Sequence, residues 1–582
     1  MRFLNNKVLY RCAAVLVVCL AVGEIASTFH ELTQTVDESS HLDCGMQLVQ
    51  GRVYDIEIKH GPLARVFVAL GPYLAGLRRA EPGGRRVDEI DTYAEGNAIL
   101  NANGNYWHNL ALARLGTLPF FLLACAVVWF WSVRIAGERA ALLSLLLFTL
   151  LPPVLGHAGL ATTDMGATAT LVAALYCLVL WMEKPSRGSA MLVGAATGFA
   201  IACKLSAVLF LPGAGAILFL LNFGTGTDAL RKRPLRKTAG DLIVALGVMY
   251  LAIWAGYLFT VYPTRPPHSH LPFDQLLAKV PPIHDALHAL LETPLPGGQL
   301  PGGLQDLAAD NRGGHTQFFL GEWRHRGWWY FFPVLLLLKT PLPFLLLSGL
   351  GAILLTVSFR KDRDWRKMAL VVIPVVILGL AMLSNIDIGL RHVLAVYPIL
   401  SIMAGYAAAE LWASVRWPWI SRAAVTGLLL CLAGSVVLAH PDYLSYFNWF
   451  ALGHPERIEV DSDLDWGQDL AQLAGWLRTA AVKDIAISYF GRADLNSAGL
   501  PEFYELLPNQ RVTGWVAISA YNRALPSPFQ VRHLPGIGAP YYSIPWNYEK
   551  LHHDPGPFAW LQEYQPIARI GTSIFVYNIG PP

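Results

Sequence analysis

Charged residues are scarce in this chain. Only 15% of its 582 residues are Asp, Glu, Lys or Arg, whereas 54% are hydrophobic and the mean hydropathy is +0.40. Soluble domains carry roughly 25% charged residues. This deficit excludes an ordinary soluble protein and indicates a large surface that faces lipid. The formal net charge is only +3, and no basic stripe is interleaved with aromatics, which argues against a nucleic-acid partner.

Cysteine and nucleotide-binding motifs are also lacking. The seven cysteines lie mostly within apolar runs and include no CxxC pair, so they predict neither a disulfide framework nor a cysteine metal site. We interpret them as small packing residues. There is no GxxxxGK[ST] loop and no Rossmann strand–turn–helix pattern. No internal repeat is visible, which weighs against the transporter folds that are built from repeats.

Long apolar runs are abundant instead. About 20 apolar residues cross a bilayer as a helix. The chain is therefore predicted to be an α-helical polytopic membrane protein with about eleven transmembrane helices, near residues 8–27, 110–132, 140–158, 165–182, 189–203, 205–222, 241–262, 334–357, 368–384, 392–412 and 421–439. The run 189–222 is too long for one crossing, so it is split at Lys204. Pro341 and Pro343 are expected to break the long segment that starts near 328.

The basic loops predict the orientation in the membrane. Lys and Arg gather after every second span, on the side of the N-terminus: Arg134, Arg139, Lys184, Arg187, the cluster 231–237, the cluster 360–367, Arg416 and Arg422. Such loops face the cytoplasm. We therefore expect a multi-pass membrane protein with a cytoplasmic N-terminus. The polar segments near 28–108 and 263–330, and the tail from 440, would lie outside.

The tail differs in character from the rest of the chain. Residues 465–480 have the pattern of an amphipathic helix, and residues 484–489, 514–521 and 573–579 have the pattern of short strands. We predict two domains. Residues 1–439 form the transmembrane domain, and residues 440–582 form a small soluble α/β domain outside the membrane, a normal size for a domain.

Acidic residues open the first outer loop. Asp37 and Glu38, followed by His41, come about ten residues after the first span. Carboxylates so close to a membrane are costly unless they are solvated, paired or metal-bound. One interpretation is a general base that takes a proton from an acceptor. The other is a solvated loop start in which Asp37 caps a helix at 39–50.

Four further charged residues come from separate segments at the same predicted face: Arg114, Asp164, Lys204 and Arg391. An intramembrane charge is a functional candidate by default. Two of them also have a simpler explanation, because Arg114 can snorkel to the surface and Asp164 can cap a helix with Thr162 or Thr163. Together they combine acids for base or metal chemistry with cations for a phosphate. A transferase that acts on a lipid-phosphate donor needs both.

Two other segments combine charged and aromatic residues. Residues 321–330 place Arg324 among tryptophans at a predicted membrane interface, where an aromatic belt alone explains the tryptophans. Residues 461–465 resemble the start of a calcium loop. Trp466 stands where that loop needs glycine and Gln472 where it needs glutamate, so we interpret the segment as a strand-to-helix turn with Asp465 near the N-cap.

The motifs taken in order resemble the GT-C membrane glycosyltransferases, in particular the protein O-mannosyltransferases of glycosyltransferase family 39 and the lipid A aminoarabinose transferase. Asp37-Glu38 with His41 looks like the acidic first-loop motif of that group. The stretch 60–63 is similar to its His-Pro-Pro-Leu stretch, with glycine in place of one proline. Matching segments follow at 113–115, 161–164, 204–206, 327–330, 339–343 and 461–469.

This resemblance implies a glycosyltransferase that moves a sugar, with inversion, from a polyprenyl-phosphate donor to a lipid, glycan or protein acceptor on the outer face of the bacterial inner (plasma) membrane. It implies that Asp37 is the base, that Glu38 supports it and that Arg114 organises the site. His41, His60, Lys204, Arg324 and Arg391 would bind the donor phosphate or substrate, and Asp164 would be the ligand if a divalent cation is used. Two other functions stay open, namely a transporter or flippase for lipid-linked sugars and a non-catalytic membrane assembly partner.

Overall fold

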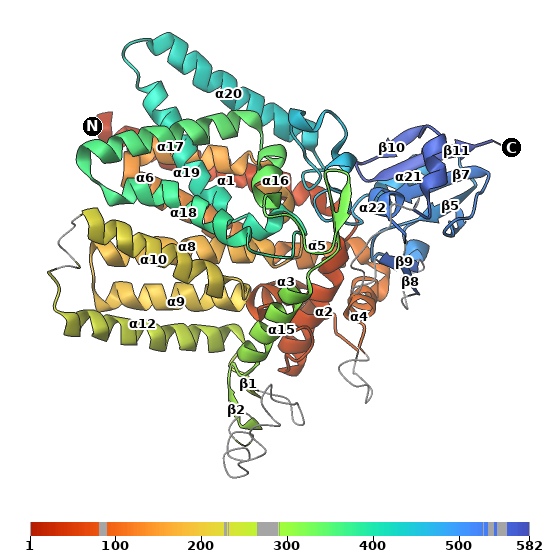
Figure 1. Cartoon of the computed structure of the whole chain (residues 1–582), viewed down its shortest axis with the longest axis horizontal. Coiled ribbons are helices and arrows are strands. Elements are labelled where there is room, and N and C mark those ends of the chain that lie inside the picture. The colour runs from red at the N-terminus through yellow and green to blue at the C-terminus, as the bar shows by residue number, and fades with distance from the viewer. Residues whose placement is uncertain are drawn as a thin grey trace.

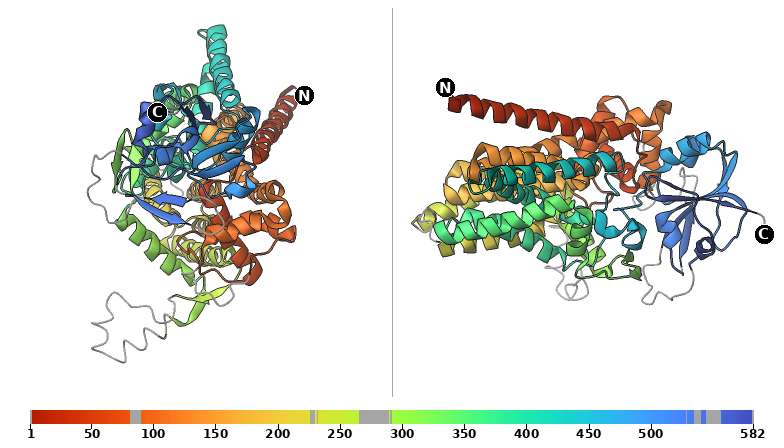
Figure 2. Two further views of the ribbon diagram at one scale, coloured as in Figure 1. Left: turned by 90° about the vertical axis from the view of Figure 1, so that its right-hand side faces the viewer. Right: turned by 90° about the horizontal axis from the view of Figure 1, so that it is seen from above.

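The computed structural model describes residues 2–80, 90–225, 230, 232–264, 289, 292–527, 529–533, 540–543 and 556–580. Long, roughly parallel helices form a bundle, and a small sheet domain lies at one end of it (Figure 1). The N-terminus lies at the opposite end of the bundle from this domain (Figure 2). The chain is therefore a helical membrane protein with a C-terminal α/β domain, as its sequence predicts.

Helices fill the predicted membrane windows. The long ones are α1 (Arg2–Ser27), α6 (Leu118–Thr149), α8 (Asp164–Glu183), α9 (Arg187–Cys203), α10 (Ala207–Thr225), α12 (Leu235–Gly256), α17 (Leu342–Asp362), α18 (Trp365–Ala381), α19 (Val396–Trp412) and α20 (Pro418–Ala439). Seven segments of the described chain are long and apolar enough to cross a membrane. One of them, Tyr106–Thr149, is far too long for a single crossing and reverses at Gly137, where φ is 83°. The helices α9, α18 and α19 are shorter, with 17 residues each.

Two predicted interruptions appear where expected. Helix α9 ends at Cys203, Lys204 is extended, and α10 begins at Ala207. Helix α16 (Phe331–Lys339) ends before Pro341, and α17 begins after it because the Pro341 ring and its missing N–H cannot continue the helix. Both interruptions lie toward the end of the bundle that faces the sheet domain (Figure 1). They place Lys204 and Lys339 at that end.

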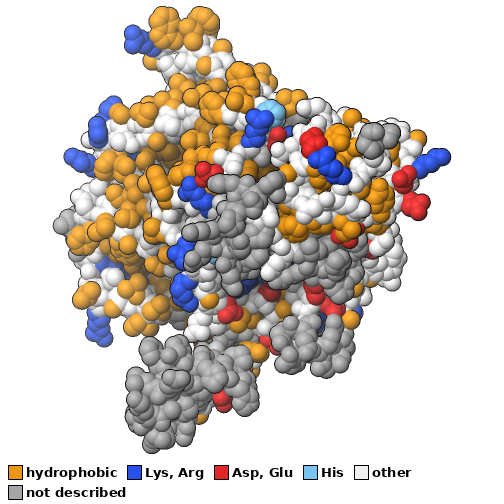
Figure 3. All heavy atoms as spheres, turned by 45° about the vertical axis from the view of Figure 1, so that its right-hand side comes forward, with side chains coloured by type: hydrophobic (Ala, Val, Ile, Leu, Met, Phe, Trp, Pro, Cys, Tyr) orange, Lys and Arg blue, Asp and Glu red, His pale blue; other side chains and the backbone are white. Residues whose placement is uncertain are grey.

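The basic loops meet at the other end. Arg11 of α1 pairs with Glu138 in the turn of α6 at 2.9 Å. Arg134 and Arg366 both pair with Glu183, which ends α8. These contacts join the N-terminal helix to three loops that the positive-inside pattern assigned to one side. Hydrophobic side chains predominate over the bundle between the two ends on the face in Figure 3, as expected for a lipid-facing surface.

A layer of short elements separates the bundle from the sheet domain. It contains α2 (Val36–Gly51), α3 (Pro62–Leu74), α4 (Thr92–Leu100), α5 (Tyr106–Leu115), α7 (Pro152–Ala158), α15 (Gln299–Gly313), the hairpin β3–β4 (Gln317–Phe319, Glu322–Arg324) and the short helix η4 (Leu390–Val393). A second hairpin, β1–β2, joins Val261–Pro263 to Pro294–Pro296. Helix α2 starts one residue after Thr35, whose side chain and Glu38 form a capping box. Thr35, and not Asp37, is therefore the N-cap, and the Asp37 carboxylate is free for other contacts.

The C-terminal domain contains a five-stranded sheet in the order β10-β11-β7-β5-β6. Its strands are β5 (Asp484–Ser488), β6 (Glu502–Glu505), β7 (Gly514–Ser519), β10 (Ala568–Ile570) and β11 (Ile574–Ile579). Helix α21 (Leu470–Thr479) covers one face through an apolar cluster. The predicted strands are confirmed, but the helix starts five residues later than expected. Asp469 and not Asp465 precedes it, because residues 461–469 form a turn that bonds to other parts of the chain.

Residues 440–469 connect the sheet domain to the bundle. The side-chain amide of Asn448 donates to the carbonyl oxygens of Leu337 and Thr340 at the break between α16 and α17. The Tyr443 hydroxyl donates to Glu24 of α1 at 2.9 Å. Trp466, Val460 and Leu464 pack with Val36 and with strands of the sheet in one apolar cluster. This segment therefore fastens the domain to the layer that contains α2.

Candidate functional site

A cavity of about 350 Å³ lies between the bundle and the sheet domain. This volume is within the range of small-molecule sites. Its wall toward the bundle includes Thr163, Asp164, Lys204, Ser206 and His392. Its wall toward the sheet domain includes Tyr93, Asp461, Trp466, Phe490, Arg492 and Tyr521. The cavity thus joins residues that are hundreds of positions apart in the chain.

Asp37 and Arg391 lie in this cavity as an ion pair. The Nη1 atom of Arg391 donates to Oδ2 of Asp37 at 2.7 Å, and the two side chains are 11% and 24% exposed. The guanidinium also lies over the Trp466 ring, 4.3 Å from its centroid. Burial opposes the charge on Arg391, but Asp37, Asp164 and Asp461 raise its pKa well above the usual range. Arg391 is therefore a permanent cation that faces carboxylates from three segments.

Asp164 and Lys204 form a second pair nearer the bundle. The Lys204 ammonium donates to Oδ1 of Asp164 at 2.7 Å, and the Thr162 hydroxyl donates to Oδ2 at 3.1 Å. Lys204 is presented here because the helix break exposes it between α9 and α10. Gly61 permits the close approach of the next loop, since a Cβ there would lie 2.3 Å from the Ala202 carbonyl oxygen. This contact explains why the 60–63 motif has glycine at that position.

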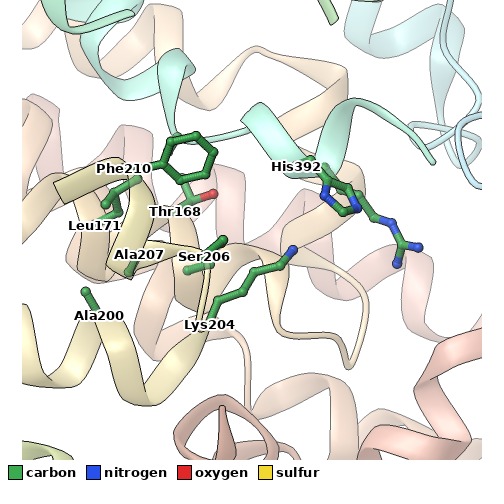
Figure 4. A pocket seen from close by; sticks show the side chains of 11 residues that line it. Thr168, Leu171, Ala200, Lys204, Ser206, Ala207, Phe210 and His392 are labelled. Carbon is green, nitrogen blue, oxygen red and sulfur yellow. The ribbon is translucent and has the colours of Figure 1, made fainter. Parts of the chain in front are cut away.

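A small apolar pocket extends from this pair between the membrane helices. Thr168, Leu171, Ala200, Ala207, Phe210 and Ala395 line it, with Lys204, Arg391 and His392 at its mouth. Lys204 and His392 face one another across the pocket, while Phe210 and Leu171 lie farther toward the bundle (Figure 4). Lys204 and Arg391 thus border the polar cavity on one side and apolar surface on the other. The pocket itself holds only about 20 Å³, so it marks apolar surface beside the two cations and is not a channel for a chain.

His41 and His60 lie together on the cavity wall. Their ring centroids are 5.4 Å apart. Burial and the Arg65 guanidinium lower the pKa of His41 to about 3, and burial lowers that of His60 as well. Both imidazoles are therefore neutral near pH 7. Arg65 Nε donates to Nδ1 of His41 at 3.0 Å, which leaves the His41 proton on Nε2 as a hydrogen-bond donor.

Arg65 was not singled out in the sequence, although it follows the 60–63 motif by two residues at the start of an apolar helix. Its side chain is completely buried and also donates to the Tyr54 hydroxyl and to Glu57. Burial would raise the pKa of Glu57, but Arg65, together with the Ser40 hydrogen bond and Lys59, lowers it. Arg65 thus fixes the orientation of His41 from behind the cavity wall.

Glu38 and Arg114 meet outside the cavity. Their two hydrogen bonds, Nε to Oε1 at 2.8 Å and Nη2 to Oε2 at 2.9 Å, form a bidentate ion pair that is fully buried. Arg114 also donates to the carbonyl oxygens of Phe29, Leu32 and Thr33, and Glu38 accepts the Ala161 N–H. Because these bonds connect α2 with the end of α1 and the start of α8, the pair supports the chain on which Asp37 and Asp164 lie.

Glu38→Gln is expected to destabilise the protein strongly. It leaves the buried Arg114 charge without a counter-ion, and breaking a buried pair in this way costs about 3–5 kcal/mol. The apparent unfolding temperature in detergent should fall clearly. In the double variant Glu38→Gln/Arg114→Met it should recover in part, because no buried charge is left unpaired. An unchanged unfolding temperature in the single variant would contradict a structural role for the pair.

Two predicted residues lie elsewhere or have another partner. Arg324, expected to bind donor or substrate, is not among the cavity-lining residues, and its side chain pairs with Glu322 at 2.8 Å on the exposed β3–β4 hairpin. Asp164, the expected ligand for a divalent cation, has Lys204 on its carboxylate. The described residues contain no cluster of three His, Cys, Asp or Glu side chains at metal-binding spacing. Metal binding by Asp164 stays a prediction.

Sequence reasoning missed the contribution of residues 461–466. Asp461 and Trp466 line the cavity, although we interpreted this segment only as a turn. Burial raises the pKa of Asp461 to about 6 although Arg391 lowers it. A usable signal was present, since 461–469 matched the family motif and had too many carboxylates for an ordinary turn.

Residues 108–254 match the family model described as dolichyl-phosphate-mannose-protein mannosyltransferase. This match confirms the resemblance to GT-C glycosyltransferases that the sequence motifs predicted. No curated protein matches the chain by sequence.

Solved structures of several membrane glycosyltransferases are similar to this one. ArnT from Cupriavidus metallidurans bound to undecaprenyl phosphate is 13% identical, with a TM-score of 0.46 over 91% of this chain and 97% of that chain. The archaeal oligosaccharyltransferase AglB from Archaeoglobus fulgidus, in complex with an inhibitory peptide and a dolichol-phosphate, is 12% identical, with a TM-score of 0.49 over 93% of this chain and 75% of that chain. The Pmt1-Pmt2 complex of S. cerevisiae bound to the sugar donor is 18% identical, with a TM-score of 0.30 over 42% of this chain and 33% of that chain.

Proposed function

We propose that this chain transfers a sugar from a polyprenyl-phosphate donor to an acceptor hydroxyl at the outer face of the bacterial inner membrane. One observation carries the proposal. The cavity that contains Asp37 also contains Arg391 and Lys204, and these two cations stand at the mouth of an apolar pocket between membrane helices. A base, phosphate-binding cations and a lipid-compatible surface are the three components that such a reaction requires.

The donor end of the site is the one near the bundle. A polyprenyl chain would lie against the apolar residues of α8, α9 and α10 beside Ala395, and its phosphate would lie between Lys204 and Arg391. Arg391 donates from Nε to the Ile388 carbonyl oxygen and from Nη1 to Asp37, so it would reach the phosphate through Nη2, whereas Lys204 offers a point charge. The neutral His41 would donate from Nε2 to the sugar or phosphate. This placement leaves the sugar in the polar cavity beside Asp37.

The transfer itself needs one base and one stabilised leaving group. Asp37 takes the proton of the acceptor hydroxyl. The acceptor oxygen then bonds to the anomeric carbon as the bond from that carbon to the phosphate oxygen breaks, with inversion. The electron pair leaves with the polyprenyl phosphate, and Arg391 and Lys204 stabilise its added charge. The same Arg391 holds Asp37 at 2.7 Å and therefore fixes the base relative to the leaving group.

Lys204→Met is expected to raise the KM for the donor by about 10–100-fold, because one cation is lost from the phosphate site. The acceptor KM should change little. Asp164 would be left buried without Lys204, so the charge-neutral double variant Lys204→Met/Asp164→Asn should be measured beside it. Lys483→Met, at an exposed position of the sheet domain, is the matched control. An unchanged donor KM in both Lys204 variants would contradict this phosphate site.

Reconstitution tests the function directly. The purified chain in liposomes receives polyprenyl-phosphate mannose and other polyprenyl-phosphate sugars, with lipid, glycan and peptide acceptors, and the products are identified by mass spectrometry. A new glycosidic bond with release of polyprenyl phosphate is the expected result. Movement of the lipid-linked sugar across the bilayer without a new bond would contradict the proposal and favour a flippase.

A further inference from the structure

Residues 459–469 hold the loop of Arg391 and the chain before Asp37 in place. The Leu390 N–H donates to Oδ2 of Asp463 at 2.7 Å, and the Ser462 hydroxyl donates to the Ile388 carbonyl oxygen at 2.7 Å. These bonds fix the loop that leads to Arg391. Gly389, with φ at 106°, allows this contact, since a Cβ there would lie 2.5 Å from the Ser462 hydroxyl oxygen.

The same segment fixes the chain before Asp37. The Val36 N–H donates to the Trp466 carbonyl oxygen at 2.9 Å, and the Thr33 N–H donates to that of Gln468 at 2.9 Å. Its far end is bonded to the sheet domain, where Asp465 accepts the Tyr521 N–H at 3.0 Å. The sheet domain is thereby connected to the Asp37–Arg391 pair through hydrogen bonds.

Asp461 is the one residue of this segment whose carboxylate lines the cavity. Its Oδ1 atom accepts the Ser462 N–H at 2.7 Å, which fixes the side chain on the turn. Among the described residues, no group donates a hydrogen bond to Oδ2. Arg391 and Asp37 are the cavity neighbours that act on its charge most, besides Asp463 of its own segment. Of the three carboxylates that act on Arg391, Asp164 lies on the bundle side of the cavity and is paired with Lys204, whereas Asp37 comes from α2 and Asp461 from the sheet-domain side.

We propose that Asp461 binds the acceptor, by accepting a hydrogen bond from a hydroxyl next to the one that Asp37 deprotonates, and that the acceptor is therefore a vicinal diol, as in a sugar. This inference rests on the proposed function. A serine or threonine side chain has a single hydroxyl, so it offers no second hydroxyl to the Asp461 carboxylate, and only a backbone N–H of the peptide could take that place. A glycan with two neighbouring hydroxyls can give one proton to Asp37 and donate a hydrogen bond from the second hydroxyl to Asp461.

The chemistry of the surrounding wall agrees with a glycan. Tyr93, Trp466, Phe490 and Tyr521 line the same side of the cavity as Asp461. Polar groups among aromatic side chains are typical of sites for ligands that have both polar edges and less polar faces. A sugar ring is such a ligand.

The test compares the wild type and Asp461→Asn on acceptors with and without the hydroxyl next to the attacked one. Polyprenyl-phosphate mannose is the donor, and the acceptors are a methyl mannoside panel, its monodeoxy analogues and a threonine peptide. For the wild type, removal of the hydroxyl next to the attacked one should lower kcat/KM by about 10–100-fold, because the site is left with an unpaired acceptor. Asp461→Asn should lose a similar factor with the intact diol, mainly through the acceptor KM, and little more with the deoxy analogue.

Controls separate this inference from the proposed function. Asn keeps the oxygen that accepts the Ser462 N–H, so Asp461→Asn should fold, and Asp484→Asn on an exposed strand position is the matched control. The deoxy comparison on the wild type needs no variant at all. If the losses in kcat/KM from Asp461→Asn and from removal of the hydroxyl were independent and additive, the acceptor assignment would be overturned but the proposed function would stand. Preferred transfer to the threonine peptide would have the same consequence. No release of polyprenyl phosphate with any acceptor would overturn the proposed function.

The pH profile gives a readout that a merely structural role would not change. With a pKa of about 6, the Asp461 carboxyl becomes protonated as the pH falls below 6 and then accepts hydrogen bonds less well. The wild-type kcat/KM for the acceptor should therefore fall on the acid side near pH 6, and that limb should be absent in Asp461→Asn. Two other acidic residues of the same segment, Glu459 and Asp463, act on the charge of Asp461 or lie beside it. The other charged and imidazole groups that line the cavity are Asp37, His41, Glu57, Lys59, His60, Asp164, Lys204, Asp310, His315, Arg391, His392 and Arg492.

Discussion

Asp37→Asn should abolish sugar transfer while the protein still inserts and folds. A positioned general base contributes about 10²–10⁴-fold to a rate, and asparagine at this position cannot take the acceptor proton. The loss should therefore appear in kcat as well as in kcat/KM. The shape of the side chain is retained, and asparagine can still accept the hydrogen bond that Arg391 Nη1 donates to Oδ2 at 2.7 Å. The measurement is the single-turnover rate of polyprenyl-phosphate release in liposomes.

Controls decide between lost chemistry and lost structure in this variant. Asp484→Asn removes an exposed carboxylate from strand β5 and should transfer at the wild-type rate. Binding of the donor to Asp37→Asn should stay within a few-fold of the wild type, because Lys204 and Arg391 are unchanged. Transfer at the full rate by Asp37→Asn would refute the assigned base, whatever the acceptor.

The membrane part of the fold could be predicted from the sequence because its cause is local. A run of apolar residues must form a helix in lipid, where every backbone group has to be bonded within its own segment. Breaks also have local causes, as Pro341 and the charge on Lys204 show. A count of the crossings also predicts that the basic loops lie at one end of the helix bundle. Arg11, Arg134 and Arg366 pair with glutamates at that end.

The site was predictable only in part because its contacts are not local. Motif residues such as Asp37 and Lys204 stand out as charges beside apolar runs. Nothing near Glu38 in the sequence shows that it pairs with Arg114 outside the cavity, while its neighbour Asp37 pairs with Arg391, which is 354 positions away. Asp461 was missed for the same reason. Its position follows from bonds of residues 462–468 to two distant loops, and periodicity carries no information about such bonds.

Arg391→Met should remove at least as much activity as any other change at the phosphate site. Arg391 lies at the mouth of the apolar pocket and in the polar cavity, and it faces Asp37, Asp164 and Asp461. Its loss removes a donor to the leaving phosphate, which alone costs about 10²–10³-fold in kcat. It also leaves carboxylates facing one another, which repel the anionic donor. Donor KM should therefore rise together with the fall in kcat.

Arg391→Lys separates charge from geometry at this position. Lysine keeps the positive charge but lacks the planar fork that can bind Asp37 and a phosphate at the same time. We expect its donor KM to lie near that of the wild type, while kcat stays about 10-fold or more below it, because the base is no longer fixed against the leaving group. Arg478→Met, on the exposed side of α21, is the control. If the lysine variant restored kcat fully, Arg391 would supply charge alone, and its 2.7 Å bond to Asp37 would have no part in transfer.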